Sequence, residues 1–142
     1  MKRTARCLCG TVRFEIETGP EPEVGACHCG MCQKWAGSAG VALTVTPGTM
    51  VIEGEDNIGH YTSSDWAKRT FCRTCGSSLY YELTAPGPQQ GTRYLLVGLI
   101  DDPTGLHLNL EIFHDRRSGV FTYADETKKM TEAEVMAATF GS

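Results

Sequence analysis

The chain lacks the features of membrane-spanning, secreted and nucleic-acid-binding proteins. No apolar run approaches the ~20 residues that a membrane-spanning helix needs. No hydrophobic stretch follows the basic residues at the start of the chain, so a secretory signal is not predicted and we expect a cytoplasmic location. Lysine and arginine number 13 against 17 aspartates and glutamates, and this balance disfavours nucleic acid as a partner. Lys2, Arg3 and Arg6 are expected to be solvated charges.

The composition is that of an ordinary globular protein. The 142 residues are 41% hydrophobic and 21% charged, which argues against disorder. A chain of this length corresponds to one domain, and no linker, repeat or low-complexity tract divides it. We therefore predict a single domain over residues 1–142, with the motif-bearing part at about 4–123.

Hydrophobic periodicity predicts mainly β-structure. Between residues 11 and 17, Val12, Phe14 and Ile16 alternate with polar residues, so one face of a strand is apolar. The run 94–100 is almost continuously apolar and predicts the most buried strand. The other segments with strand character, separated by turn residues, are 41–45, 50–53, 59–62, 78–83, 106–113 and 120–123.

Helical signals are few. Thr131 and Glu134 form a capping-box pattern, which predicts one short C-terminal helix. One or two helical turns can form around 32–35. The fold class predicted from these patterns is a mainly β domain with one short C-terminal helix.

The seven cysteines carry most of the functional information. An odd number argues against a closed disulfide framework and favours metal ligation. Two clusters, Cys7-Leu-Cys9-Gly10 and Cys72-Arg-Thr-Cys75-Gly76, follow one plan in which a cysteine pair precedes a glycine and then a strand. Glycine, which has no Cβ, suits a tight turn whose amides point at sulfur. Together the two turns predict a closed zinc site with four cysteine ligands; the alternative is that these cysteines are small buried hydrophobic residues.

The middle cluster, Cys27-His-Cys29-Gly-Met-Cys32, has three thiols and no fourth cysteine. Zinc with three protein ligands and an open position is typical of a reactive site. Two alternatives stay open. A histidine (His28, His60, His107 or His114) can close the site as a fourth ligand, or two of the thiols can form a redox disulfide without metal.

The ligand set of the middle cluster favours sulfur chemistry. Three thiolates leave a zinc centre with a net charge of −1, which activates water poorly but suits an exchangeable fourth thiolate. The H-x-E signature of the zinc deaminases is absent from the sequence.

Four further residues are candidates for substrate contact. Lys34 and Arg69 lie near cysteine clusters in the sequence and can attract an anionic substrate; the alternative is a solvated charge. Ser38 lies among small residues and can donate a hydrogen bond to a ligand, or belong to a packed turn. His28 can orient a sulfur or move a proton near pH 7.

The cysteine plan resembles the glutathione-dependent formaldehyde-activating enzyme family, which includes domains like that of centromere protein V. The matching segments run from Cys7 to Gly10, from Cys27 to Lys34 with Gly37-Ser38 after it, and from Arg69 to Gly76. This resemblance implies coiled antiparallel β-sheets held by two zinc ions. One zinc is structural, on Cys7, Cys9, Cys72 and Cys75, and the other is catalytic, on Cys27, Cys29 and Cys32. The activity that the resemblance implies is carbon–sulfur bond formation or cleavage, with S-hydroxymethylglutathione as the adduct.

The leading functional hypothesis is therefore a zinc-dependent carbon–sulfur lyase that acts on a small, glutathione-like thiol and an aldehyde such as formaldehyde. The first alternative is a non-catalytic β module, held together by zinc, that binds a partner protein. The second is a thiol redox or zinc-buffering protein. Neither the oligomeric state nor the direction of the reaction can be inferred from the sequence.

Overall fold

The computed structural model describes residues 1–141 and is mainly β, as the sequence predicts. The chain groups into two compact units. Unit 1 comprises Met1–Pro22 and Ala42–Gly105, and unit 2 comprises Glu23–Val41 and Leu106–Ser142. The organisation as a single domain stays a prediction. Within the described residues, no helix has the length and apolar character needed to cross a membrane.

Unit 1 is built from antiparallel strands. One sheet has the order β1-β2-β5, with bounds Lys2–Arg6, Arg13–Glu17 and Val51–Glu53. A second run of strands has the order β4-β9-β8-β7-β6, and the residues of β4 from Ala42 onward belong to this unit. The bounds of this second set are β4 Gly40–Val45, β6 Ile58–Ser64, β7 Ala67–Cys72, β8 Ser78–Leu83 and β9 Arg93–Leu96.

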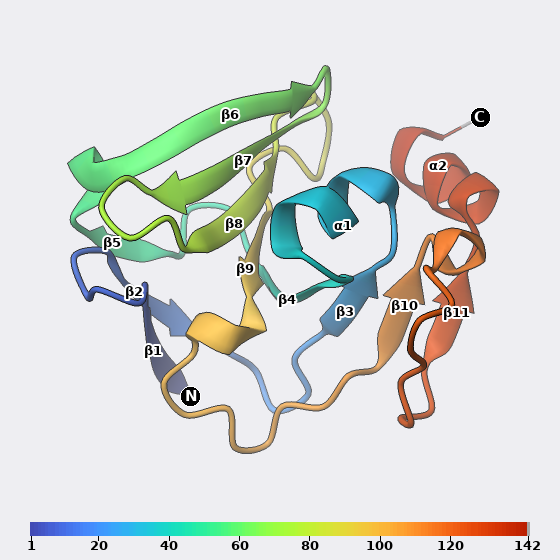
Figure 1. The fold of residues 1–142 in the computed structure, drawn as a ribbon, viewed down its shortest axis with the longest axis horizontal. Helices are drawn as coiled ribbons and strands as arrows, with labels where there is room; N and C mark the ends of the chain where they lie inside the picture. Colours follow the sequence, from blue (N-terminus) through green and yellow to red (C-terminus); the bar gives the residue numbers. More distant parts are fainter. Residues whose placement is uncertain (142) are drawn as a thin grey trace. The chain divides into compact units, whose positions relative to one another are not determined.

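Unit 2 has three parallel strands, β3 (Val24–Cys27), β10 (Leu110–Ile112) and β11 (Lys128–Met130), with β10 in the centre. Figure 1 shows these strands side by side. The helix α1 (Gly30–Ala36) follows β3, and α2 (Glu132–Phe140) follows β11. The family resemblance implies antiparallel sheets, so the parallel pairing of these three strands differs from that expectation, although the mainly β class is confirmed.

Several predicted elements are confirmed where a local signal is strong. The alternation in 11–17 becomes β2, with Val12, Phe14 and Ile16 buried. The helix expected around 32–35 is α1. The capping box at α2 is complete, because Thr131 Oγ1 accepts from Glu134 N and Glu134 Oε1 accepts from Thr131 N.

Other segments differ from their predicted structure. The apolar run 94–100 is a strand only as far as Leu96, then a 3₁₀ turn, η2 (Val97–Leu99), and in β9 only Leu95 is buried. The strand expected over 106–113 is reduced to β10. The segment 120–123 is not a strand, because the rings of Phe121 and Tyr123 pack against each other and against His28.

The basic start of the chain forms β1, in which Lys2 and Arg6 are exposed, as expected for solvated charges, but Arg3 is buried. Arg3 Nε donates to Thr18 Oγ1 at 3.1 Å and Arg3 Nη1 donates to the carbonyl of Asp102 at 2.8 Å. These bonds hold β1 at the edge of its sheet.

A short 3₁₀ turn in unit 1, η1 (Glu55–Asn57), braces the segments that carry four of the cysteines. It begins after Gly54, whose φ of +82° favours glycine. A Cβ at Gly54 would clash with the carbonyl oxygen of Thr11 and lie 3.4 Å from Val12 Cα. The turn therefore depends on glycine for both its conformation and its close contact with residues 11 and 12.

This contact predicts that Gly54→Ala destabilises the protein more than Gly48→Ala does. Gly48 also has a positive φ, +76°, but a Cβ there would meet nothing within 4 Å. Gly48→Ala should lower the free energy of unfolding by about 1–2 kcal/mol through backbone strain alone. Gly54→Ala should lower it by a further 1–3 kcal/mol, roughly, through the clash. Urea denaturation of both variants with zinc present measures the difference, and equal losses would contradict it.

Candidate metal centres

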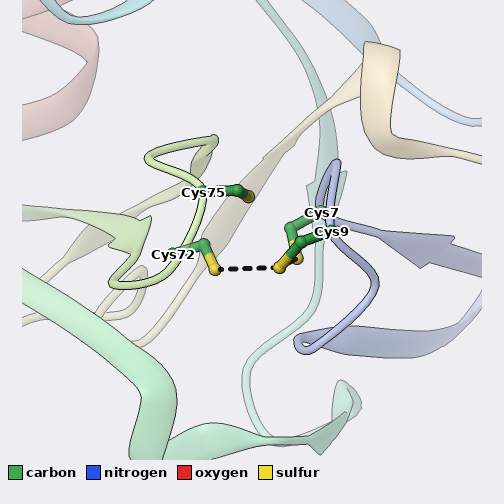
Figure 2. Close-up of side chains that lie close together, drawn as sticks. All are labelled: Cys7, Cys9, Cys72 and Cys75. Carbon is green, nitrogen blue, oxygen red and sulfur yellow. Dashed lines mark hydrogen bonds between the residues drawn. The ribbon is translucent and has the colours of Figure 1, made fainter.

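The two cysteine pairs of unit 1 lie in the turns of two β-hairpins. Cys7 and Cys9 lie between β1 and β2, whereas Cys72 ends β7 and Cys75 lies in the turn between β7 and β8. Figure 2 shows the four side chains converging from the two turns, and their sulfurs all lie within 4.8 Å of one another. The structure therefore brings together the four residues that the sequence groups into one site.

The sulfur separations suit a tetrahedral zinc ion. Zinc–sulfur bonds of about 2.3 Å place the sulfurs of a tetrahedral site about 3.8 Å apart. The Cys7 and Cys9 sulfurs are 3.6 Å apart, and those of Cys9 and Cys72 are 3.8 Å apart. The donor set and its dimensions fit a closed site for a metal that prefers sulfur.

The two turns share one backbone plan. In the first, Cys7 N donates to Val12 O at 3.0 Å and Gly10 N donates to Cys7 O at 3.1 Å. The second repeats it, since Cys72 N donates to Ser77 O and Gly76 N donates to Cys72 O, both at 2.9 Å. The glycines have φ of +81° and +78°, the left-handed conformation that lets each turn close around its cysteine pair.

Polar groups around this site favour the thiolate form of two of the cysteines. The Ser77 hydroxyl, 3.2 Å from Cys75 Sγ, is the largest cause that lowers the pKa of Cys75 to about 5. The hydroxyl and amide of Thr11 lower the pKa of Cys9. By contrast, burial raises the pKa of Cys72, and the Asn57 side-chain amide donates to its sulfur at 3.4 Å.

Asn57 and Ser77 are supporting residues that our reading of the sequence missed. Asn57 belongs to η1, and its carbonyl also accepts from Arg73 N, so the turn that contacts the first cysteine hairpin also binds the second. The Ser77 hydroxyl accepts from Leu8 N at 3.0 Å and so joins the two hairpins beside the sulfurs. Each is a single polar residue without a motif, and only its position near a turn glycine hints at the role: Ser77 directly follows Gly76, and Asn57 lies three residues after Gly54.

The three cysteines of unit 2 lie where β3 ends and α1 begins. Cys27 is the last residue of β3, Cys29 caps the N-terminus of α1, and Cys32 lies in the helix. Their sulfurs lie within 4.8 Å of one another, and Cys32 N donates to Cys29 Sγ at 3.3 Å. Hydrogen bonds with the Cys29 and Cys32 thiols, together with burial, raise the pKa of Cys27. These three sulfurs can also hold a metal ion.

No histidine joins this cluster in the described part of unit 2. The histidine nitrogens and carboxylate oxygens there do not lie within 4.8 Å of all three sulfurs. His28 instead directs Nε2 to Glu111 Oε1, at 2.8 Å, and both side chains are buried. This arrangement does not form the closed site on His28, His107 or His114 that the sequence left open as an alternative.

The other candidate residues lie in different settings. Lys34 and Ser38 are exposed, in α1 and just after it, and the Ser38 hydroxyl donates to Ala39 O at 3.4 Å. Arg69 lies in β7 of unit 1 and is buried, with its guanidinium over the Tyr81 ring at 4.8 Å from the centroid. Arg69 is therefore not a solvated charge.

Comparisons with known proteins point to one family. A family model described as glutathione-dependent formaldehyde-activating enzyme matches residues 2–116. A protein of Schizosaccharomyces pombe named as an uncharacterized lyase is 32% identical over 133 residues, 92% of this chain and 91% of its own length. A Halomonas elongata protein that carries the family's name provisionally is 30% identical over 81 residues, 52% of each chain.

A solved structure supports the fold. The crystal structure of a Rhodobacter sphaeroides protein aligns with a TM-score of 0.57 and 24% identity, covering 69% of this chain and 87% of that one. At this level of identity the likeness concerns the fold alone.

The contact between Ser77 and Cys75 predicts that Ser77→Ala raises the pKa of Cys75. Removing a hydrogen bond to a charged group costs about 1.5–3 kcal/mol when the group is buried, and Cys75 is partly exposed, so we expect an increase of about 1. Alkylation of the zinc-free, reduced protein across pH, with mass spectrometry to locate Cys75, measures this. Ser63→Ala, which removes a hydroxyl bonded to Ala67 O, is the control. An unchanged pH profile in Ser77→Ala would remove Ser77 from this role.

Proposed function

Because the chain belongs to the glutathione-dependent formaldehyde-activating enzyme family, we propose that it is a zinc-dependent carbon–sulfur lyase. Its substrates are a small thiol of the glutathione type and an aldehyde such as formaldehyde. The family assignment gives the class of chemistry, and the name of the Schizosaccharomyces pombe relative, a lyase, agrees with it.

In this proposal the four-cysteine cluster is structural. Cys7, Cys9, Cys72 and Cys75 offer four sulfurs, a complete tetrahedral set that leaves no position for a substrate. Cys7 and Cys72 are buried, Ser77 joins the two hairpins beside the sulfurs, and Asn57 donates to the Cys72 sulfur. A zinc ion here would cross-link segments 63 or more residues apart in the sequence and so stabilise unit 1.

The three-cysteine cluster is the proposed reactive centre. Cys27, Cys29 and Cys32 would hold zinc with one position left for the substrate thiol. When bound, zinc lowers the pKa of a coordinating thiol enough to deprotonate it. One observation carries the proposal. In a chain of this family, three cysteine sulfurs lie together, and no histidine or carboxylate of the described part of unit 2 joins them as a fourth ligand.

The proposed reaction is a reversible addition. In the forward direction the thiol sulfur forms a bond to the aldehyde carbon, and the proton lost from sulfur ends on the aldehyde oxygen. In the reverse direction the carbon–sulfur bond breaks and the aldehyde is released. Since thiols add to formaldehyde without a catalyst, the contribution of the protein is to hold both partners close together and to keep the sulfur ionised.

Contacts to the substrate remain proposals. Lys34 and Ser38 are exposed near the end of α1, where a cationic and a hydroxyl side chain can meet an anionic thiol. Arg69 and His28 are buried and held by neighbouring side chains. We therefore propose that they stabilise the structure around them and do not move to meet the substrate.

Metal analysis provides the first prediction from this assignment. Reduced protein should hold two zinc ions per chain, and brief treatment with a mild chelator should remove one of them. The one removed should be that of the three-cysteine cluster, because three ligands hold zinc less firmly than four. Elemental analysis before and after treatment measures this. Two zinc ions that both resist removal would instead favour a closed middle site and a partner-binding module.

Substitution of Cys29 tests the activity itself. Cys29→Ser should abolish the protein's acceleration of thiol–aldehyde exchange and lose one zinc per chain, because it removes one of three ligands. Exchange spectroscopy by NMR with glutathione and formaldehyde measures the rate.

A matched control lies in the same segment. Met31 is exposed between Cys29 and Cys32, so Met31→Ala should keep both zinc ions and the exchange rate. If the wild type and Cys29→Ser exchange thiol and aldehyde equally fast, the lyase proposal fails.

A further inference from the structure

We propose that Glu111 is a positioning residue, which acts through His28 to fix the segment 27–32 so that its three sulfurs converge. The inference rests on the proposed metal site at Cys27, Cys29 and Cys32 but not on lyase activity.

The main chain of His28 is held on both sides. Its N–H donates to the carbonyl of Ile112 in β10 at 3.0 Å, and its carbonyl accepts from Gln33 Nε2 in α1 at 2.7 Å. Gln33 Nε2 also donates to the carbonyl of Arg116 at 3.0 Å. The backbone between the cysteines is therefore tied to β10, α1 and the segment after β10.

The side chain of His28 is held by Glu111 from the central strand. Glu111 lies opposite Ala26 of β3 and Lys129 of β11 in the parallel register, so its carboxylate lies close to the end of β3. Glu111 Oε1 is 2.8 Å from His28 Nε2, and Glu111 and His28 are each 3% exposed. The other oxygen, Oε2, accepts from the Thr127 hydroxyl and lies 3.8 Å from Lys129 Nζ.

The direction of the hydrogen bond follows from the charge of the carboxylate. Burial alone would raise the pKa of Glu111, but the hydrogen bonds from Thr127 and His28 together with the Lys129 charge outweigh it and lower the pKa. At neutral pH Glu111 is therefore ionised and only accepts, so the proton of this bond belongs to His28 Nε2.

Aromatic rings fix the plane of the imidazole. The His114 ring meets it edge-on at a centroid distance of 5.9 Å, and the rings of Tyr123 and Phe121 lie at 5.9 Å and 6.5 Å. Turning the imidazole away from Glu111 would break the bond between two buried polar groups, which costs free energy.

Fixing His28 orients the cysteines on either side of it. The backbone is extended here, since Cys27 ends β3 and Cys29 has φ −64° and ψ 155°. Alternate side chains of an extended segment point in opposite directions. With His28 held toward Glu111, Cys27 and Cys29 both project to the opposite side, where Cys32 from α1 meets them.

The test compares zinc release from Glu111→Ala, Glu111→Gln and Glu82→Ala protein. Glu82 is a matched control, a carboxylate of unit 1 that is largely buried and pairs with Arg93 at 2.7 Å. Transfer of zinc to a coloured chelator gives the release rates of the two ions separately, and ¹⁵N NMR of the His28 ring reports which nitrogen carries the proton. The ring measurement requires no metal.

We expect Glu111→Ala to release the more labile zinc on the order of 10- to 100-fold faster, with the slower zinc unchanged. Glu111→Gln has an amide oxygen that can still accept from Nε2, so this variant should release the labile zinc at a rate close to that of the wild type. In the wild type the ¹⁵N pattern should show a proton on Nε2, and Glu111→Ala should change it.

Two results would overturn the inference. One is a labile-zinc release rate in Glu111→Ala equal to that of the wild type. The other is faster release of both ions in Glu111→Ala to the extent seen in Glu82→Ala, which means a loss of general stability. If Glu111→Ala does not fold, an unchanged labile-zinc release rate and an unchanged ring pattern in Thr127→Val, which removes the hydroxyl that donates to Glu111 Oε2, would overturn it. If the protein binds two zinc ions and Glu111→Ala speeds release of the labile one, but the protein does not accelerate thiol–aldehyde exchange, the lyase proposal fails and the role of Glu111 stands.

Discussion

The convergence of four cysteine sulfurs from distant parts of the chain is the constraint on which unit 1 depends. The four sulfurs lie within 4.8 Å of one another, so each hairpin must fix its backbone to place its pair correctly. Each turn is closed by the same pair of backbone hydrogen bonds and a left-handed glycine. The turn η1 then contacts one hairpin through Gly54 and binds the other through Asn57. The β-sheets behind the turns, with Phe14 and Tyr80 packed edge to face at 6.0 Å, supply the rigid support.

The cluster of unit 2 poses a different physical problem. Its three cysteines lie within six residues of one another, so gathering them costs little chain entropy. Orientation is the harder requirement, because an extended segment can rotate about its axis and send two sulfurs away from the third. The contacts described for the His28 side chain come from residues more than 80 positions later in the sequence, with Glu111 83 residues away. Local spacing thus brings the three cysteines together, and tertiary contacts orient their side chains toward one another.

The cysteine grouping could be predicted from the sequence because spacing and glycine placement are local signals. The same holds for β2, whose alternation is clear, and for α2, whose capping box is complete. Parallel pairing of β3, β10 and β11 could not be predicted, since Lys128-Lys-Met130 is polar and too short to show a period. The segment 120–123 has strand composition, but its aromatic rings pack on a histidine instead of pairing in a sheet. Glu111 and Ser77 matter through partners far away in sequence, which no local pattern encodes.

The four cysteines of unit 1 are unequally exposed, so this cluster is accessible from one side. Cys9 is exposed, next to the largely exposed Leu8, whereas Cys7 and Cys72 are buried and Cys75 is intermediate. A chelator or a metal-accepting protein would therefore reach Cys9 before the other three cysteines, and a metal held here would be released from that side first. An oxidant or an electrophile would likewise react first with Cys9, the most accessible of the four thiols.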